Sequence, residues 1–150
     1  MFDFIYAEEE ILDHPRTQSI RARFADAQLV PCARYGEVFN RAAQNFRLQK
    51  QRPALILAHK SGHLALPTPP GYGIGSQSNY YFSHMLNCLY DCRYCFLQGM
   101  YRSAHMVVFV NYEDFKSAID ARIATSTDTP YFFSGYDCDS LALDPVSAFS

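Results

Sequence analysis

Three of the chain's five cysteines lie within eight residues, at Cys88, Cys92 and Cys95. Thiols at this spacing can bind a soft metal ion or an iron–sulfur cluster, or they can pair in disulfides. Disulfides are uncommon in a reducing cytosol, and the number of cysteines is odd. The C-x3-C-x2-C spacing therefore predicts a metal centre in this segment.

Two kinds of metal centre fit three thiolates differently. A structural zinc ion needs a closed set of four ligands. Here the fourth would have to come from elsewhere in the chain, and the candidates are Cys32, Cys138, His84 and His105. A cubane [4Fe–4S] cluster can take three thiolates and leave its fourth iron free to bind a small molecule through amine and carboxylate groups. The spacing, with Tyr94 directly before the last cysteine, favours the iron–sulfur cluster.

The rest of the chain has the alternating pattern of an α/β protein. Apolar runs predict strands at 4–6, 29–31, 54–58, 78–86, 106–110 and 131–135. Helical periodicity predicts helices at 19–24, 34–51 and 111–123, and a helix start near 144 with Asp144 as N-cap and Pro145 at the first position. The acidic run 8–10 predicts a solvated face or a first helical turn. Proline and glycine mark 59–78 as a long connection.

From residue 79 onward, strand and helix alternate around the cysteine segment, which predicts parallel β/α units. We expect two parts: a small α/β segment at 1–78, and the beginning of a partial (β/α) TIM-type barrel at 79–150, which stops before the later units. A loop that leaves a strand at the mouth of such a barrel would suit a cluster with an open iron.

Composition narrows the classes of partner. Of the 150 residues, 49% are hydrophobic and 19% charged, with a formal net charge of −2, which indicates a folded protein without an overall basic surface. The acidic N-terminus does not resemble a secretion signal, and no apolar run is long enough to span a membrane, so we expect a cytoplasmic protein without membrane contact. The segment 34–60 is locally basic, with six basic residues and one acidic residue; it is either a solvated face or a surface that follows phosphates.

The cysteine motif C-x3-C-x-aromatic-C resembles the signature of the radical S-adenosylmethionine (SAM) enzymes. The longer stretch CLYDCRYCFLQ resembles the spore photoproduct lyase branch of that family, whose members have roughly C-x3-C-x-YC-[YF]-LQ. Upstream RPALILAHK, and downstream HMVVFVNYEDF and YDCDSLALDP, resemble the family's flanking segments. The resemblance extends over about residues 30–150, and the cysteine motif is its sharpest part.

The resemblance implies a [4Fe–4S] cluster on Cys88, Cys92 and Cys95, with SAM at the open iron. Such enzymes reduce SAM, with electrons from a donor such as flavodoxin or ferredoxin, to a 5′-deoxyadenosyl radical that abstracts a hydrogen atom. In spore photoproduct lyases the substrate is a thymine photoproduct in DNA. The resemblance places Tyr94 beside the adenine of the cofactor, and Ser140 at a family serine near the cofactor if the alignment slips by two residues. Asp137 and Asp139, near the end of the later strand, could contact hydroxyl groups of the cofactor. Turn formation is an equally good role for Asp137 and Asp139.

Two departures from the lyase pattern concern the later steps of repair. Phe96 stands where repairing members tend to have a tyrosine that relays a hydrogen atom. The hydrogen-donating cysteine of the family falls at Tyr136 in an ungapped alignment, or at Cys138 if the alignment slips by two residues. A radical SAM enzyme with another substrate, a zinc-binding interaction module and an inactive remnant therefore stay open as alternatives.

A few further residues have simpler explanations. His59 and His63 have no third ligand nearby in the sequence, although a metal role is possible for them. His84 and His105 are expected to be structural, with a hydrogen bond to the cysteine loop as the alternative for each of them. Cys32 is expected to be a buried apolar residue, and Gln98 to brace the loop backbone.

Overall fold

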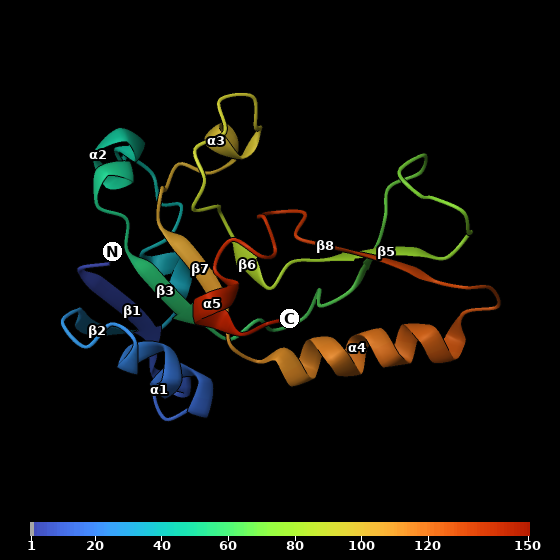
Figure 1. Ribbon diagram of the computed structural model, residues 1–150, viewed down its shortest axis with the longest axis horizontal. Helices are drawn as coiled ribbons and strands as arrows, with labels where there is room; N and C mark the ends of the chain where they lie inside the picture. The colour runs from blue at the N-terminus through green and yellow to red at the C-terminus, as the bar shows by residue number, and fades with distance from the viewer. Residues whose placement is uncertain (1) are drawn as a thin grey trace.

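The computed structural model describes residues 2–150, which form a mixed α/β fold with two sheets (Figure 1). The main sheet has the strand order β2-β1-β3-β7-β6, with bounds β1 Phe4–Glu8, β2 Gln28–Cys32, β3 Leu55–Ala58, β6 Met85–Leu86 and β7 Met106–Phe109. The second sheet has the order β4-β5-β8, with bounds β4 Leu66–Pro67, β5 Asn79–Phe82 and β8 Tyr131–Ser134. The helices are α1 Pro15–Ala22, α2 Phe46–Gln51, α3 Leu97–Met100, α4 Tyr112–Thr125 and α5 Asp144–Ser147, with 3₁₀ turns η1 Glu9–Ile11 and η2 Tyr35–Glu37.

The main sheet is parallel except at one edge. Strands β2, β1, β3 and β7 run parallel, and the short β6 pairs antiparallel with β7. Every residue of β3 and β7 is buried, as expected for central parallel strands that are covered on both faces. Because β7 pairs with β3, strands from both sides of residue 78 share this sheet.

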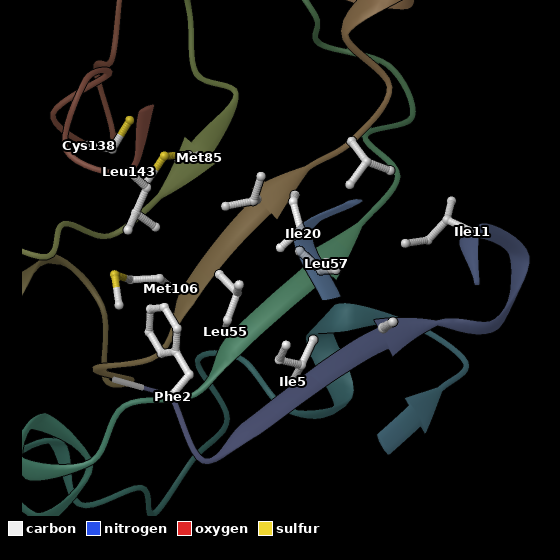
Figure 2. Packing of buried hydrophobic residues seen from close by; sticks show 13 residues of the cluster. Phe2, Ile5, Ile11, Ile20, Leu55, Leu57, Met85, Met106, Cys138 and Leu143 are labelled. Atoms are coloured by element: carbon white, nitrogen blue, oxygen red, sulfur yellow. The ribbon is translucent and has the colours of Figure 1, made fainter. Parts of the chain in front are cut away.

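Alternate residues of β3 and β7 belong to two hydrophobic clusters, one on each face of the sheet. The first contains Leu55, Leu57, Met106 and Val108 and also takes in side chains from β1, α1 and the C-terminal turns (Figure 2). The second contains Ile56, Ala58, Val107 and Phe109, together with Phe115 of α4. The continuous apolar runs at 54–58 and 106–110 therefore reflect double-sided burial.

Several predicted elements are confirmed. The strands expected at 4–6, 29–31, 54–58, 106–110 and 131–135 are present as β1, β2, β3, β7 and β8. The helix expected at 111–123 is α4, and the helix expected at 19–24 is the second half of α1, which begins earlier, at Pro15, with His14 as its N-cap. The final helix begins at Asp144, so its N-cap is Leu143, one residue before the predicted position.

The helix predicted over 34–51 is wrong. Only Phe46–Gln51 is α-helical, and Asn40 and Ala43 have positive φ angles that interrupt any helix through this region. Phe39 is instead buried beside Tyr101, with ring centroids 4.9 Å apart, so tertiary packing overrides the helical periodicity.

The expectation for the acidic run 8–10 is confirmed for Glu9 and Glu10, which are exposed and begin η1, but it is wrong for Glu8. This carboxylate is completely buried, and its two oxygens accept hydrogen bonds from the backbone N–H groups of Tyr35 and His59, each at 2.8 Å. It ties the chain after β2 and the chain after β3 to the end of β1.

The strand predicted over 78–86 is divided at Ser83 and His84. Its first half, β5, pairs with β8 in the second sheet, whereas its second half, β6, pairs with β7 in the main sheet. The pairing of β5 with β8 is parallel, as expected for a β/α unit, but the pairing of β6 with β7 is antiparallel, which the prediction did not include. The cysteine loop, which follows β6, therefore begins just after the chain passes from the second sheet to the main sheet.

None of the helices formed by residues 2–150 combines the length and the apolar character that a membrane crossing requires.

Candidate iron–sulfur site

The cysteine loop connects β6 to α3 and is fixed at its start by Asn87. Asn87 has a φ of 69°, a left-handed conformation that asparagine tolerates better than most residues. Its side-chain amide donates to the carbonyl oxygens of Ser103 at 2.6 Å and His105 at 2.9 Å, and its backbone N–H donates to Asp137 O at 2.9 Å. Asn87 therefore anchors the loop to the chain before β7 and to the chain after β8.

Short turns shape the rest of the loop. The N–H of Cys95 donates to Cys92 O at 3.0 Å, and the N–H of Gln98 donates to Cys95 O at 3.1 Å. The Gln98 side chain donates to the carbonyl oxygen of Tyr90 at 3.3 Å, which confirms the predicted bracing role of Gln98.

The three loop cysteines are free thiols of intermediate exposure. They line one pocket of about 430 Å³ together with the last residue of β8 and the turn that follows it: Ser134, Gly135, Tyr136, Cys138, Asp139 and Ser140. In residues 2–150, however, no three His, Cys, Asp or Glu side chains are close enough together to hold a metal ion as they stand. The three thiols form no disulfide and share one pocket, so they are compatible with an iron–sulfur cluster. The loop would have to bring the three sulfur atoms closer together to bind it.

The turn after β8 depends on Gly135, which has a φ of 82°. A Cβ atom at this position would lie 2.8 Å from Cys138 O and 2.9 Å from Ser140 N, so a larger residue would displace the turn. The Ser83 hydroxyl accepts the N–H of Asp137 at 3.1 Å, which joins this turn to the segment between β5 and β6.

Cys138 is the most buried residue of the pocket, with 5% of its surface exposed, and it lies beside Met85 and Leu143 at the edge of the first hydrophobic cluster (Figure 2). Burial, followed by the nearby Asp137 carboxylate and Cys88, raises the pKa of its thiol to about 12. Cys138 is therefore a protonated thiol at neutral pH that lines the same pocket as the three loop cysteines.

Tyr136 and Phe96 face each other from opposite sides of the pocket. Their ring centroids are 6.4 Å apart, and Tyr136 also packs on Tyr81 at 5.0 Å. Both Tyr136 and Phe96 are largely exposed, at 52% and 62%. The site therefore has an open aromatic wall beside the thiols.

The structure does not bring all of the predicted site residues together. Tyr94 is 93% exposed and is not among the residues that line the pocket. Ser140 and Asp139 do line it, and one carboxylate oxygen of Asp139 accepts the N–H of Leu141 at 2.9 Å, as in a turn. Asp139 thus has the turn-forming contact that was its alternative explanation.

The histidines near the site have structural roles. His84 is fully buried and stacks on Phe149, with ring centroids 3.6 Å apart. In the part of the chain that the structure describes, neither of its ring nitrogens has a hydrogen-bond partner, so the alternative of a bond from His84 to the cysteine loop is wrong. Burial lowers the pKa of His84 to about 4. His105 accepts the N–H of Ala54 at 3.0 Å, and Cys32 is buried, as expected.

The sequence prediction missed four residues that help to hold the two loops in place: Asn87, Gly135, Ser83 and Tyr101. Asp137, for which turn formation was one of the two predicted roles, also takes part through its backbone. Tyr101 lies near the Asp137 carboxylate, and burial is the main cause of the raised pKa of its hydroxyl. An asparagine directly before the first cysteine and a glycine at the end of a strand were the available signals, since both residue types favour left-handed backbone.

The comparison with solved structures identifies the fold. The chain superimposes on spore photoproduct lyase with a TM-score of 0.78 for a mutant with bound AdoMet and dinucleoside spore photoproduct, at 17% sequence identity. For the complex with dinucleoside spore photoproduct the TM-score is 0.77, again at 17% identity, and a tyrosine-to-phenylalanine mutant gives 0.77 at 18%. Each match covers 99% of this chain and 44% of the lyase chain.

This chain therefore has the fold of part of spore photoproduct lyase, and it spans less than half of that enzyme's length. No family model and no curated protein matches the sequence.

Proposed function

We propose that the chain carries a radical SAM site in which Cys88, Cys92 and Cys95 hold a [4Fe–4S] cluster. The observation that carries this proposal is the shared pocket: three free loop thiols open into it, in a fold shared with spore photoproduct lyase. A cluster of this kind supplies the electron for reductive cleavage of SAM, and hence the abstraction of a hydrogen atom from a substrate.

The residues of this chain would divide the remaining tasks. The bonds of Asn87 and the turns at Cys92 and Cys95 hold the three thiols on one side of the pocket. Asp139 and Ser140 line the opposite side, where a cofactor would lie, and the exposed Tyr94 would have to fold over the adenine. The buried side of the pocket, at Cys138, is shielded from water by Met85 and Leu143.

Cys138 is a better candidate for the hydrogen-donating residue than Tyr136. Its thiol is buried and protonated, and it lies in the pocket close to Cys88. Two of the solved lyase chains carry a substituted tyrosine and a substituted cysteine, whose separation along that enzyme equals the separation between Phe96 and Cys138 here. This equality supports the alignment that slips by two residues.

The proposed substrate is a thymine photoproduct in DNA, in keeping with the dinucleoside spore photoproduct bound by the lyase structures. Phe96 favours a second candidate, a radical reaction on another substrate, because it brings no hydroxyl to the pocket. Electrons would come from a small donor protein such as flavodoxin or ferredoxin. Cleavage of SAM that is stimulated by ultraviolet-damaged DNA, and not by undamaged DNA, would decide for repair.

A zinc-binding module is the other candidate, and a specific observation favours it: Cys138 adds a fourth thiol to the same pocket. The burial of Cys138 among apolar side chains argues against this, because zinc requires a thiolate there.

Anaerobic reconstitution tests the proposal directly. Iron, sulfide and zinc would be assayed, and electron paramagnetic resonance spectra would be recorded with and without SAM. We expect a cubane signal that shifts when SAM is added. The variant Cys92→Ala should lose the cluster, whereas Cys32→Ala, at a buried cysteine outside the pocket, should retain it. Stoichiometric zinc, or a cluster that is indifferent to SAM, would contradict the proposal.

A further inference from the structure

The main sheet contains a second place where a ligand can bind, away from the cysteine loop. The chain leaves β1 to form β2 on one side of it and then returns to form β3 on the other side. The connections after β1 and β3 therefore diverge, and a crevice opens outside the carboxyl ends of these two strands. In open parallel α/β sheets, ligands bind in such crevices.

A cavity of about 350 Å³ lies at this point. Each wall comes from the end of a parallel strand: Glu8 from β1, Arg34 and Tyr35 from the chain after β2, and His59, Lys60 and His63 from the chain after β3. This volume is at the lower end of the range for small-molecule sites.

The buried Glu8 forms the floor of the crevice and is already satisfied. Its carboxylate oxygens accept the N–H groups of Tyr35 and His59, so the negative charge is held by the two chain segments that make the walls. Glu8 therefore shapes the crevice, and the groups that remain to bind a ligand are on the other walls.

Lys60 is the cation that the protein leaves available there. Its backbone is fixed by Asn111, which accepts the Lys60 N–H at 2.9 Å and donates to the Lys60 carbonyl at 3.0 Å. Its ammonium group lies 4.8 Å from the centroid of the Phe109 ring, and no carboxylate in residues 2–150 lies within 4 Å of it.

In residues 2–150, two neighbouring basic side chains each have an acidic partner within 4 Å, whereas Lys60 has none. Arg34 pairs with Glu10 at 2.8 Å, and His59 pairs with Asp114 at 3.3 Å. Burial lowers the pKa of Lys60, and the more distant Asp137 carboxylate acts in the opposite direction. A half-buried ammonium group without an ion-pair partner is stabilised by an anion that enters the crevice.

We propose that this crevice binds a phosphate group, contacted by Lys60 with Arg34 and His63 at its rim. The phosphate belongs either to a free nucleotide or to a nucleic-acid strand, which share this chemistry. The inference does not depend on the iron–sulfur site, because its residues belong to a different pocket.

The test is a titration of the cluster-free chain, labelled with ¹⁵N and followed by NMR. The probes are inorganic phosphate, thymidine 5′-monophosphate and a thymidine oligonucleotide without terminal phosphates. We expect saturable shifts of the amide signals of residues 59–63, with affinity weakened about tenfold in Lys60→Gln, the loss expected for one charge-assisted contact. The control is Lys116→Gln on α4, an exposed lysine outside the crevice, which should bind like the unaltered chain.

The probes separate the two sources of phosphate. Binding of phosphate and the monophosphate, without the oligonucleotide, assigns the crevice to free nucleotides. Binding of the oligonucleotide that is sensitive to Lys60→Gln assigns it to a nucleic-acid strand. Saturation at 59–63 that Lys60→Gln and Arg34→Gln both leave unchanged, or no saturation with any probe, would overturn the proposal, provided that the variants keep the spectrum of the folded chain.

Discussion

The two sheets of this molecule differ in how fully their strands are covered. In the main sheet, β3 and β7 are buried at every position and are packed by a hydrophobic cluster on each face. In the second sheet, all four residues of β8 are at least partly exposed. Tyr80 of β5 stacks on Phe132 of β8, and Tyr81 packs against Tyr136 in the turn after β8. The candidate pocket is lined on one side by the cysteine loop, which follows β6 of the main sheet, and on the other by the end of β8 and the turn after it. One side therefore adjoins the well-packed main sheet, and the other belongs to the partly exposed second sheet.

The comparison indicates that the main sheet provides most of the stability, whereas the groups available for chemistry lie beside the second sheet. The main sheet supplies the fixed points, Glu8 and the anchored start of the cysteine loop at Asn87. The pocket side of β8 keeps exposed aromatic surface and polar groups that a cofactor or substrate would cover. Regions with few buried apolar contacts open more readily, and binding sites are often drawn from them.

The largest expected difference is in the free energy of unfolding when one large side chain is truncated in each sheet. Leu57→Ala, in the fully buried β3, should lower the free energy of unfolding by about 2–5 kcal/mol, because it leaves a cavity in the first cluster. Phe133→Ala, in the half-exposed β8, should cost about 1–2 kcal/mol. Urea denaturation followed by circular dichroism would measure both, and equal losses would show that the two sheets are equally covered.

The same contrast explains what the sequence could predict. Strands β3 and β7 were predictable because double-sided burial produces continuous apolar runs. The interruption of the 34–51 helix was not, because its cause is the packing of Phe39 against Tyr101, which is remote in sequence.

For the site, the clustering of the three cysteines in one loop was visible in the spacing. Their shared pocket with Cys138 depends on the turn at Gly135 and on the bond between Asn87 and Asp137, which join distant segments. The position of Tyr94 outside the pocket lining likewise follows from loop geometry and not from its place in the motif.

Replacing Glu8 tests whether the main sheet depends on a buried charge. In Glu8→Gln, one oxygen can still accept a hydrogen bond, but the other position becomes an NH₂ group facing a backbone N–H. We expect a loss of about 1–3 kcal/mol in the free energy of unfolding, the cost of an unsatisfied buried donor. Glu10→Gln, in an exposed ion pair, is the matched control and should cost less than about 1 kcal/mol. A similarly small loss for both variants would contradict the idea that the two hydrogen bonds of Glu8 hold the chain after β2 and the chain after β3 in place.

The buried His84 should make stability depend on pH. Its pKa is lowered to about 4 in the folded chain, from 6.5 when unfolded, so between these values the unfolded chain binds more protons. The contribution is fully present above pH 6.5 and is lost as the pH falls towards 4, by on the order of 3 kcal/mol.

Urea unfolding at several pH values would measure this slope. His84→Phe, which preserves an aromatic ring against Phe149, should flatten it, whereas His63→Ala, at an exposed histidine, should leave it unchanged. An unchanged slope in His84→Phe would mean that other groups carry the pH dependence, such as His105, whose pKa burial also lowers.

The smallest expected effect is at Gln98, and it tests whether the cysteine loop is a unit of local stability. The Gln98 side chain makes one partly exposed hydrogen bond, to the carbonyl oxygen of Tyr90, so Gln98→Ala should cost at most about 1 kcal/mol. Because that bond lies within the loop, the loss should appear as faster hydrogen exchange at residues 88–98, with exchange in β3 and β7 unchanged. Gln51→Ala, at an exposed position at the end of α2, should alter neither. Faster exchange in the main sheet as well would mean that the loop and the core open together, and the separation between the site and its supporting sheet would no longer hold.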